Sequence, residues 1–489
     1  MLWRKNMNRH HSWFWINITS VLILVAGLTI VFAQDNELET KVDAYIKPYL
    51  ETGNYSGTIL LAKDGKIILN KGYGYADYEQ EIPAGVSTKY PLGSIGKQVT
   101  AVGIMQLIDK GIISEKDTIN KFLPKYRYGK KITVHHLLTH TSGIPELNES
   151  SPYANRLNAP LSTPEGRIEL LNRQKLNFNP GSSYRYTNIG FWLLARILET
   201  ASGEDFEDYI QKNIFDAAGM NDSYTDMGQI IKKRATGHYW MHQGLVKSYY
   251  FERPTRGAFF TTTGDMYKFL RGIIDATLIS AESRDKMLTL HNDVYGYGFF
   301  ISDGPNGKTV WHGGNSVGYR ANVMHSYSND LTMVIFTNIF NCPFYKIVND
   351  LSAIVDGKTV ATPKSYKMAQ IDMSVTDQFI GSYRDKGDNV VEISRDEEGL
   401  YIDITRKSAN LGTTLRNRMG LFPMAEDRFF VMDLAIEIYF PDGTDKRSSR
   451  LHFISSGKTT EMERFRNRNA RRNISGPPVR RQDDDSGPP

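Results

Sequence analysis

Ser94 and Lys97 lie three residues apart in the stretch 91–111, whose apolar residues recur at helical spacing and end at Gly111. On one turn of a helix such a pair shares a face, with Cβ atoms about 5–6 Å apart. A lysine in that place can reach the serine hydroxyl, and burial would favour its neutral form, which is a general base. The N–H groups of a first helical turn lack intrahelical acceptors and can stabilise an oxyanion. Because S-x-x-K pairs are common by chance, a catalytic interpretation depends on companion residues.

Two further short stretches carry suitable companions. Tyr186 and Asn188 place a phenol and an amide two residues apart before a predicted helix, and the segment 311–315, WHGGN, ends a predicted strand. Each of these residues alone is better explained by a structural role, as a helix cap or in core packing. Only their joint occurrence with Ser94 and Lys97 favours catalysis.

Three other features are better explained by structure than by chemistry. His136 and His140 are four residues apart, but no H-E-x-x-H motif or third ligand accompanies them, so we expect helix-end packing rather than zinc. The segment 304–309, GPNGKT, lacks the glycine that a phosphate-binding loop needs at position 302, so we expect a hairpin turn. Cys342, the only cysteine, excludes an intramolecular disulfide and is expected in the core.

The catalytic candidates need a framework of strands and helices. Two apolar runs around Asp64-Gly65 predict a β-hairpin at 57–63 and 66–74. Closing strands are predicted at 308–311, 319–326 and 331–337. Mostly helical and turn-rich segments separate the hairpin from these strands. The pattern predicts an α/β (α+β) fold, in which helices flank an antiparallel sheet and a helical subdomain is inserted between its first and last strands.

The last part of the chain has a different pattern. Short strands between turns are predicted at 390–393, 400–404, 428–432, 435–440 and 451–454. That spacing predicts a small all-β barrel or sandwich. The expected organisation is a signal peptide or anchor (1–33), a main domain (34–354), a linker (355–374), the all-β domain (375–463) and a disordered basic tail (464–489).

The charge distribution argues against a nucleic-acid partner. The net charge is +5, but residues 1–33 carry three basic residues and no acidic one, and residues 464–489 carry seven arginines against three aspartates. The body between these ends is therefore slightly negative, and no basic face is expected. The 489 residues are enough for two or three domains with a large core.

The N-terminus predicts export. Arg4, Lys5 and Arg9 precede the apolar stretch 21–33, whose end, Val-Phe-Ala, approximates a small-x-small cleavage site. We expect a secretory signal peptide and a periplasmic or secreted protein. An uncleaved membrane anchor is the alternative, because the apolar segment counted from Ile16 nears spanning length. The N-terminus or the basic tail would also allow peripheral association with the cell envelope, although a solvated tail is the simpler expectation.

In order and spacing these motifs resemble the serine β-lactamase and penicillin-binding-protein superfamily, in particular the class C β-lactamase-like branch of esterases and D-amino-acid peptidases. The similar stretches are the hairpin 57–74, S-x-x-K at 94–97, LLTHTSGIP at 137–145, Y-x-N at 186–188, GAFFTTTGDMYKF at 257–269 and H-G-G at 312–314. The resemblance covers about residues 36–350. The C-terminal domain resembles, more weakly, the lipocalin-like barrel often appended to this branch, with 379–383 as its opening strand.

The resemblance implies a role for each matching residue. Ser94 would form an acyl-enzyme, with Lys97 as its base. Tyr186 would pass the proton to the leaving group and help to activate the deacylating water, while Asn188 would orient Lys97 and the substrate. The backbone N–H groups of Ser94 and Asn315 would form the oxyanion hole. This chemistry requires no metal or organic cofactor.

One departure from the family pattern bears on the substrate. Typical β-lactamases and penicillin-binding proteins carry K-T-G where this chain has His312, Gly313 and Gly314, which would orient the substrate here. A permanent cation and a hydroxyl suited to a substrate carboxylate are lost, since histidine is largely neutral at pH 7.

We therefore expect an exported serine hydrolase that cleaves an ester, amide or D-amino-acid peptide in a small molecule or peptide. The alternatives are a β-lactamase or penicillin-binding carboxypeptidase, and a catalytically silent protein that binds peptidoglycan or a peptide. A metallohydrolase using His136 and His140 is disfavoured. The sequence gives no expectation for the oligomeric state.

Overall fold

The computed structural model describes residues 37–147, 163–225, 230–248, 258–305, 307–408, 413–444, 446–455 and 457–466. The predicted signal segment and residues 467–489 of the predicted basic tail lie outside these residues. The start of that tail was predicted wrongly to be disordered, because Arg464 and Phe465 belong to the strand Lys458–Phe465. The chain divides into two compact units that meet in sequence at residues 366 and 367, with 407–414 grouped with the first. Within the described ranges, every helix is too short or too polar to cross a bilayer.

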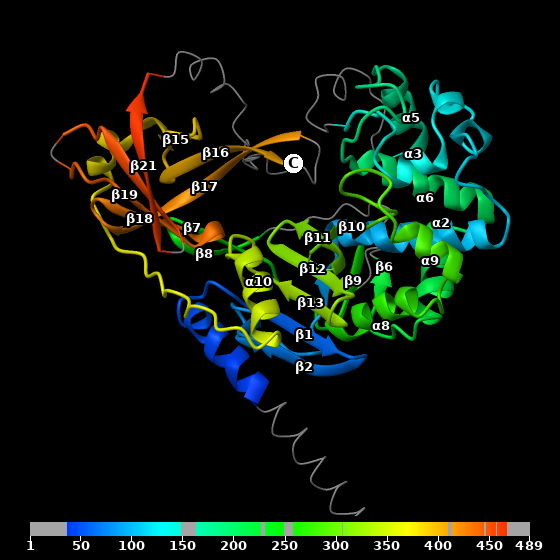
Figure 1. Ribbon diagram of the computed structural model, residues 1–489, viewed down its shortest axis with the longest axis horizontal. Helices are drawn as coiled ribbons and strands as arrows, with labels where there is room; N and C mark the ends of the chain where they lie inside the picture. The colour runs from blue at the N-terminus through cyan, green and yellow to red at the C-terminus, as the bar shows by residue number, and fades with distance from the viewer. Residues whose placement is uncertain are drawn as a thin grey trace, which may run out of the picture. The chain divides into compact units, whose positions relative to one another are not determined.

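The first unit is built on an antiparallel sheet of six strands in the order β10-β11-β12-β13-β1-β2 (Figure 1). The strands are β1 (Gly57–Lys63), β2 (Lys66–Tyr73), β10 (Phe300–Gly304), β11 (Gly307–Ser316), β12 (Tyr319–Ser326) and β13 (Leu331–Thr337). β1 pairs with β13, so the first and last strands of the unit are neighbours. The predicted hairpin and closing strands are confirmed, and Gly304 pairs with Gly307 across a hairpin turn as expected.

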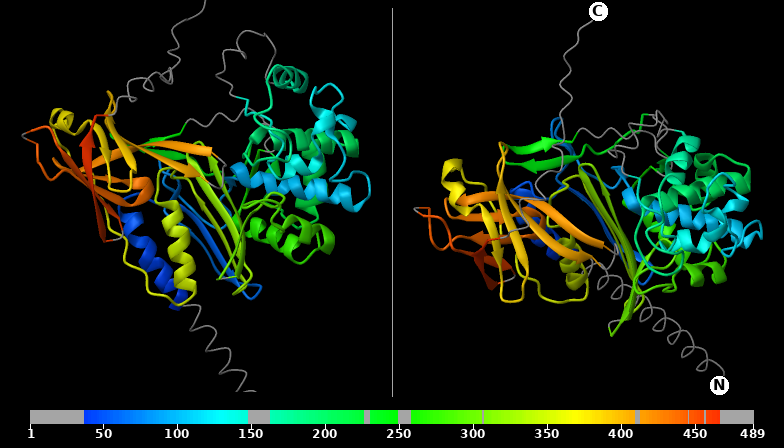
Figure 2. Two further views of the ribbon diagram at one scale, coloured as in Figure 1. Left: turned by 45° about the horizontal axis from the view of Figure 1, so that its top comes forward. Right: turned by 90° about the horizontal axis from the view of Figure 1, so that it is seen from above.

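Each face of this sheet carries its own hydrophobic core. The helix formed by residues 37–51 and α10 (Phe344–Val355) cover one face and lie side by side in the left view of Figure 2. Their apolar side chains pack with Ile59 and Ile335, and Cys342 is buried in the same cluster as expected. The alternate strand residues, such as Leu60, face the helical insertion. The fold class predicted from the sequence is therefore confirmed.

The insertion supplies the helices that carry the candidate residues. They are α2 (Gly96–Asp109), α3 (Val134–Leu138), α5 (Pro164–Asn172), α6 (Asn188–Ser202), α7 (Phe206–Ile210), α8 (Thr263–Ile274) and α9 (Ala281–Met287). α2 and α6 pack closely because Gly103 has no side chain, and a Cβ there would lie 2.6 Å from Leu198 Cδ1. The two helices that begin at the candidate site are thus held together in the core.

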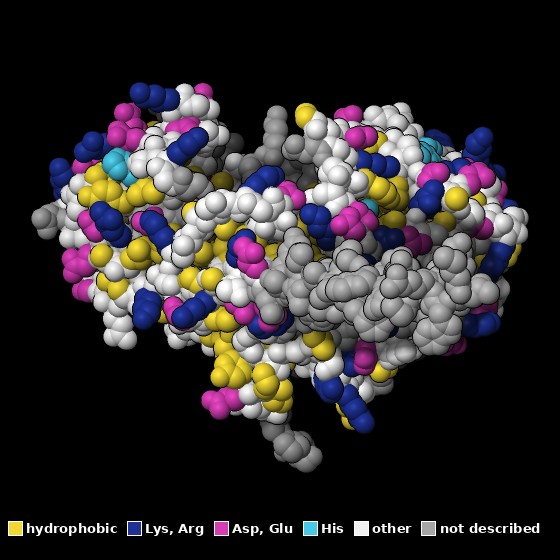
Figure 3. Space-filling model, turned by 60° about the horizontal axis from the view of Figure 1, so that its bottom comes forward, with side chains coloured by type: hydrophobic (Ala, Val, Ile, Leu, Met, Phe, Trp, Pro, Cys, Tyr) yellow, Lys and Arg dark blue, Asp and Glu magenta, His cyan; other side chains and the backbone are white. Residues whose placement is uncertain are grey.

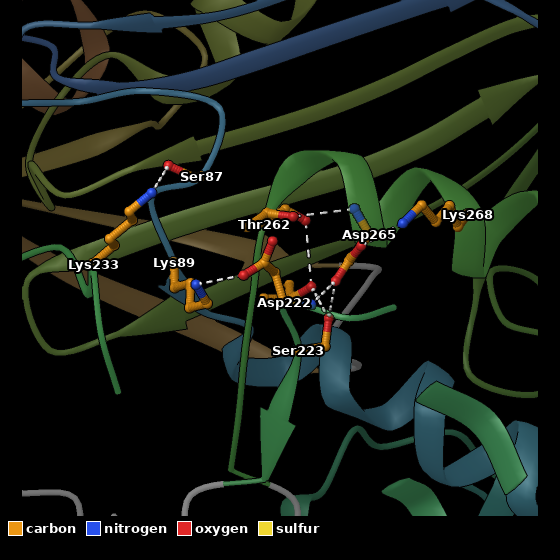
Figure 4. A network of polar contacts seen from close by, with 9 residues as sticks. Ser87, Lys89, Asp222, Ser223, Lys233, Thr262, Asp265 and Lys268 are labelled. Atoms are coloured by element: carbon orange, nitrogen blue, oxygen red, sulfur yellow. Dashed lines mark hydrogen bonds and ion pairs between the residues drawn. The ribbon is translucent and has the colours of Figure 1, made fainter. Parts of the chain in front are cut away.

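A network of polar contacts fixes the small sheet that leads into Ser94 (Figure 4). This sheet joins β5 (Tyr90–Pro91), β9 (Phe259–Thr261) and β6 (Tyr224–Thr225). Asp265, 4% exposed at the start of α8, accepts hydrogen bonds from Asp222 N at 2.7 Å and Ser223 Oγ at 3.0 Å. The buried Lys89 forms an ion pair with Asp222 at 2.8 Å. Since Lys89 immediately precedes β5, the network anchors the strand from which the Ser94 turn emerges.

Two short hairpins complete the first unit. One joins β3 (Tyr75–Asp77) to β4 (Ile82–Pro83), and the other joins β7 (His238–Met241) to β8 (Gly244–Lys247). On the face that Figure 3 shows, basic and acidic side chains are interspersed. The described residues of that face therefore form no continuous basic stripe of the kind that follows a nucleic-acid backbone.

The second unit is a closed barrel of eight antiparallel strands, which confirms the barrel of the two predicted alternatives. The strands are β14 (Gly381–Arg384), β15 (Val390–Arg395), β16 (Leu400–Ser408), β17 (Thr413–Ala425), β18 (Arg428–Val431), β19 (Ile436–Tyr439), β20 (Arg450–Ser455) and β21 (Lys458–Phe465). Apolar side chains fill its interior, where Phe379 stacks on Phe440 with ring centroids 4.0 Å apart. β17 and β21 were not expected from the sequence. In β17, Arg, Asn, Gly and Pro interrupt the apolar residues. In β21, polar residues dominate and only Met462 is buried.

Candidate active site

Ser94 and Lys97 contact one another across the junction of two short helical elements. Ser94 lies in the 3-10 helix Gly93–Ile95, and Lys97 is the second residue of α2. The sequence placed both in the first turn of one α-helix, whereas the structure inserts a tighter turn before α2. The expected contact survives this difference, because Lys97 Nζ donates a hydrogen bond to Ser94 Oγ at 3.1 Å. Only 8% of Lys97 is exposed.

Lys97 also joins this pair to the start of α6. Its Nζ donates to Asn188 Oδ1 at 2.7 Å and lies 4.8 Å from the ring centroid of Tyr186. The ring of Phe191 is 5.9 Å from the same atom. All of these contacts are to uncharged groups. The structure thus brings together four of the residues that the sequence singled out, from segments about ninety positions apart.

The loop that follows α3 holds the Tyr186–Asn188 segment in place. His140 Nδ1 accepts a hydrogen bond from Thr187 N at 3.3 Å, and its carbonyl accepts one from Arg185 N at 3.0 Å. Glu146 Oε2 accepts from Thr187 Oγ1 at 2.7 Å and from Asn188 N at 2.8 Å. A carboxylate at this point also complements the positive end of α6. The backbone on both sides of Tyr186 is therefore fixed by residues some forty positions earlier.

His140 is a packing residue with a defined protonation state. It is 1% exposed, and its ring lies 4.3 Å from that of Tyr186. Burial, reinforced by the charge of Lys97, lowers its pKa well below the ordinary value, so the imidazole is neutral. His136 lies within α3 and accepts from Thr133 N, whereas His140 follows the helix with φ of +57°. The two histidines do not share a helix face.

Among the residues that the structure describes, one group of carboxylates is close enough to share an ion: Glu199, Asp205 and Glu207. It lies near the end of α6 opposite to Asn188, and its members serve local structure. Glu199 pairs with Arg196 and accepts from a backbone N–H, while Asp205 caps α7. Burial raises the pKa of Glu207 to about 7, which makes it a poor cation ligand. Nothing in this group points to a metal that acts on Ser94.

The edge of β11 positions the backbone N–H of Asn315, the second oxyanion donor that the resemblance predicts. β10 pairs with β11 only as far as Trp311, so the strand edge beyond that residue is open. The carbonyl of Lys308 accepts from Tyr327 N, which places the even-numbered residues of β11 in the ladder with β12. The N–H and C=O of Asn315 therefore point to the open edge. A Cβ on Gly93 would lie 2.9 Å from Asn315 N, so this N–H faces the turn that carries Ser94.

The approach of β11 to this turn depends on glycine. A Cβ on Gly314 would lie 2.0 Å from the carbonyl oxygen of Leu92, a distance at which the backbone would have to move. Gly93 itself has φ of +52°, a conformation that glycine adopts without strain. These two glycines allow β11 to approach closely the turn that carries Ser94.

His312 is an internal residue. It is 1% exposed; its Nδ1 donates to the Gly313 carbonyl at 2.7 Å, and its Nε2 accepts from the Tyr295 hydroxyl at 3.0 Å. Burial, reinforced by the charge of Lys97, lowers its pKa to about 3, so it is neutral at pH 7. Any orienting role toward a substrate would thus pass through its backbone rather than its imidazole.

Sequence reasoning does not find Glu146 or Tyr295. Glu146 follows the LLTHTSGIP motif directly. Its partners are a backbone N–H and a hydroxyl, and such contacts require no particular sequence spacing that would reveal them. Tyr295 lies in an irregular segment before β10, and only the fold places its hydroxyl against His312.

Comparisons with known proteins identify the family of this chain. The Beta-lactamase family model matches residues 42–355. Penicillin-binding protein 4* of Bacillus subtilis is 27% identical over 429 residues, which cover 82% of this chain and 93% of that protein. The octameric penicillin-binding protein homologue from Pyrococcus abyssi superposes with a TM-score of 0.59 at 25% identity, over 88% of this chain and 99% of that one. The D-amino acid amidase from Ochrobactrum anthropi shares the fold, with a TM-score of 0.57 at 18% identity over 66% and 99% of the two chains. The chain therefore belongs to the Beta-lactamase family, a family of serine hydrolases.

Proposed function

We propose that this protein is an exported serine hydrolase that cleaves an ester, amide or D-amino-acid peptide through an acyl-Ser94 intermediate. The observation that carries the proposal is the contact of Lys97 Nζ with both Ser94 Oγ and Asn188 Oδ1, at 3.1 and 2.7 Å. A nucleophile, a base within hydrogen-bond reach and an orienting group are the parts that acyl transfer requires.

The proposed reaction uses these groups in sequence. The Ser94 oxygen attacks the substrate carbonyl while its proton passes to Lys97 Nζ, which acts as the general base. The oxygen of the tetrahedral intermediate lies between the N–H groups of Ser94 and Asn315. As the carbon–leaving-group bond breaks, the proton moves to the leaving group, with Tyr186 as the relay. Water then repeats the attack on the acyl group and restores the Ser94 hydroxyl.

The surroundings of His312 support a substrate that needs no fixed cation. A residue that is 1% exposed, with its pKa lowered to about 3, offers no positive charge to a carboxylate. A β-lactamase or a carboxypeptidase acting on a terminal D-amino acid would lack that charge-assisted contact at this position. We therefore favour esters, amides and D-amino-acyl compounds, the last in line with the name of the Ochrobactrum amidase.

The test is turnover of a substrate panel by the wild type and by Ser94→Ala, with and without EDTA. The panel contains p-nitrophenyl esters, D- and L-amino-acid amides and a chromogenic cephalosporin. We expect turnover of at least one ester or amide that EDTA leaves intact and Ser94→Ala abolishes, with slow cephalosporin hydrolysis. Fast cephalosporin hydrolysis would instead identify a β-lactamase. Absence of all turnover in folded protein would favour the catalytically silent binding protein.

Export is the second part of the proposal. It rests on the basic residues before an apolar stretch within residues 1–33. Expression in a bacterial host, followed by fractionation and intact-mass measurement, tests it. A mature protein that starts near residue 34 in the periplasm or medium is the expected result. A full-length species in the membrane fraction would indicate the uncleaved anchor, and full-length protein in the cytoplasm would contradict export.

A further inference from the structure

Gly313, the first glycine of the H-G-G stretch in β11, lies close to a tyrosine hydroxyl from another element. Successive residues of β11 face opposite sides of the sheet, so Gly313 faces α10 while His312 faces the catalytic side. A Cβ on Gly313 would lie 3.2 Å from the hydroxyl oxygen of Tyr345, in the first turn of α10. The space that a side chain at position 313 would enter is therefore approached by a hydroxyl from another element.

Tyr345 is free to meet a ligand. Its residue is 48% exposed, although its hydroxyl lies close to the sheet. Within the described part of the chain this hydroxyl forms no hydrogen bond, whereas Nζ of the neighbouring Lys346 donates to Asp350 Oδ2 at 2.5 Å. A tyrosine hydroxyl is a good donor to oxygen acceptors. Its location next to the open edge at Gly313 places that donor on the path of a substrate bound there.

We propose that the Tyr345 hydroxyl forms a substrate subsite beside Gly313 and donates a hydrogen bond to an acceptor oxygen, carboxylate or carbonyl, that the substrate carries beyond its scissile bond. The inference rests on the proposed hydrolase function and names a group its substrates should have. A substrate lying along the open edge of β11 is in the plane of the sheet, so it reaches both the Ser94 side and the α10 side. The hydroxyl that the H-G-G sequence lacks is thus supplied from α10.

The subsite explains how the site selects substrates without a cation. His312 is buried and neutral, so a hydroxyl is the donor that the structure offers at this part of the edge. A hydroxyl binds both a carboxylate and an uncharged carbonyl, but it gives nothing to a substrate that has no oxygen there. Sites built to hydrogen-bond a group discriminate strongly against analogues that lack it.

The test compares wild type with Tyr345→Phe, which removes one oxygen from a half-exposed side chain. The substrates are an N-acyl-D-alanyl-glycine, its methyl ester and the corresponding ethylamide, which offer a carboxylate, a carbonyl and no acceptor. For Tyr345→Phe we expect kcat/KM to fall about tenfold or more for the first two and to change less than about twofold for the ethylamide. Tyr327→Phe, at a tyrosine with 42% exposure in a turn remote from β11's open edge, is the matched control and should change none of them.

A second-site variant separates a lost hydrogen bond from a structural effect. Gly313 has no left-handed backbone angle, and apart from Tyr345 its Cβ would meet only the Ala321 carbonyl at 3.8 Å. Serine at 313 therefore fits once the tyrosine oxygen is gone. We expect Gly313→Ser to restore part of the activity of Tyr345→Phe on the two acceptor substrates, and Gly313→Ala not to do so.

The outcomes are distinct from those of the hydrolase proposal. Equal losses on all three compounds, or no loss on any, would overturn the subsite while leaving Ser94-dependent hydrolysis intact. If the wild type turns over none of the compounds, their dissociation constants for Ser94→Ala and for Ser94→Ala with Tyr345→Phe test the subsite directly. Weaker binding of the acceptor compounds alone to the double variant supports it, and unchanged binding refutes it.

Discussion

The neutrality of His312 predicts a measurable dependence of stability on pH. In the folded protein burial lowers the pKa of His312 to about 3, while the unfolded chain has the ordinary value of 6.5. Below pH 6.5, His312 therefore binds a proton in the unfolded chain but not in the folded protein. The stability that His312 contributes is complete above pH 6.5 and is lost as the pH falls toward 3. The perturbation that isolates it is His312→Asn, which keeps polarity but cannot titrate.

The size of the effect follows from the two pKa values. Between pH 7.5 and pH 5.0, a shift from 6.5 to about 3 costs the folded state about 2 kcal/mol. Other histidines whose pKa is lowered, such as the buried His140 and the half-buried His135, add their own losses in both proteins. The difference between the two proteins cancels these contributions, and it also cancels any constant cost of losing the contact with Tyr295.

The assay is urea denaturation of the wild type and His312→Asn at pH 7.5 and pH 5.0. The free energy of unfolding of the wild type should drop by about 2 kcal/mol more than that of the variant over this interval. Equal drops in the two proteins would refute the neutral, buried histidine. A smaller drop in the wild type would mean that a cation is present at this position, and β-lactam or D-Ala-D-Ala recognition would regain support.

Three further substitutions test the framework around Ser94. Glu146→Ala should lower kcat on the best substrate about tenfold by freeing the backbone of Asn188, while Glu146→Gln, which keeps an acceptor oxygen, should stay within about threefold; equal rates for both variants would contradict this role. Gly314→Ala should lower kcat/KM at least a hundredfold, because its Cβ would lie 2.0 Å from the Leu92 carbonyl, whereas Gly304→Ala, with nothing within 4 Å, should be silent in the same assay. Asp265→Ala should lower the free energy of unfolding by about 3 kcal/mol in urea denaturation through loss of its buried hydrogen bonds, and a loss below about 1 kcal/mol would show the network to be dispensable.

The strands of the main sheet were predictable because their burial requires runs of apolar residues. β13 (Leu331–Thr337) is buried along its whole length, and β1 along nearly all of it, so both appear as apolar runs bounded by turn residues. The start of α2 was less predictable, because a 3-10 turn and an α-helix share the same spacing over a few residues. In the barrel, β17 escaped prediction because Arg, Asn, Gly and Pro interrupt its pattern.

The candidate site likewise contains some residues that the sequence could reveal and others that it could not. Ser94, Lys97 and Asn188 could be found because reactive side chains occur in short motifs, and the structure brings them into contact. Glu146 and Tyr345 could not be found from spacing. Glu146 contacts a backbone N–H about forty residues away, and the Tyr345 hydroxyl lies close to a glycine that has no side chain. Neither contact produces a pattern in a single sequence.

The central claim is that Ser94 is the nucleophile of an acyl-enzyme. The most direct measurement is intact-mass spectrometry with peptide mapping of the wild type and Ser94→Ala after exposure to a fluorophosphonate probe. The account predicts one adduct on the wild type, located on the peptide that contains Ser94, and none on the variant. An adduct at another residue, or no adduct on wild-type protein whose circular dichroism shows it to be folded, would contradict the account.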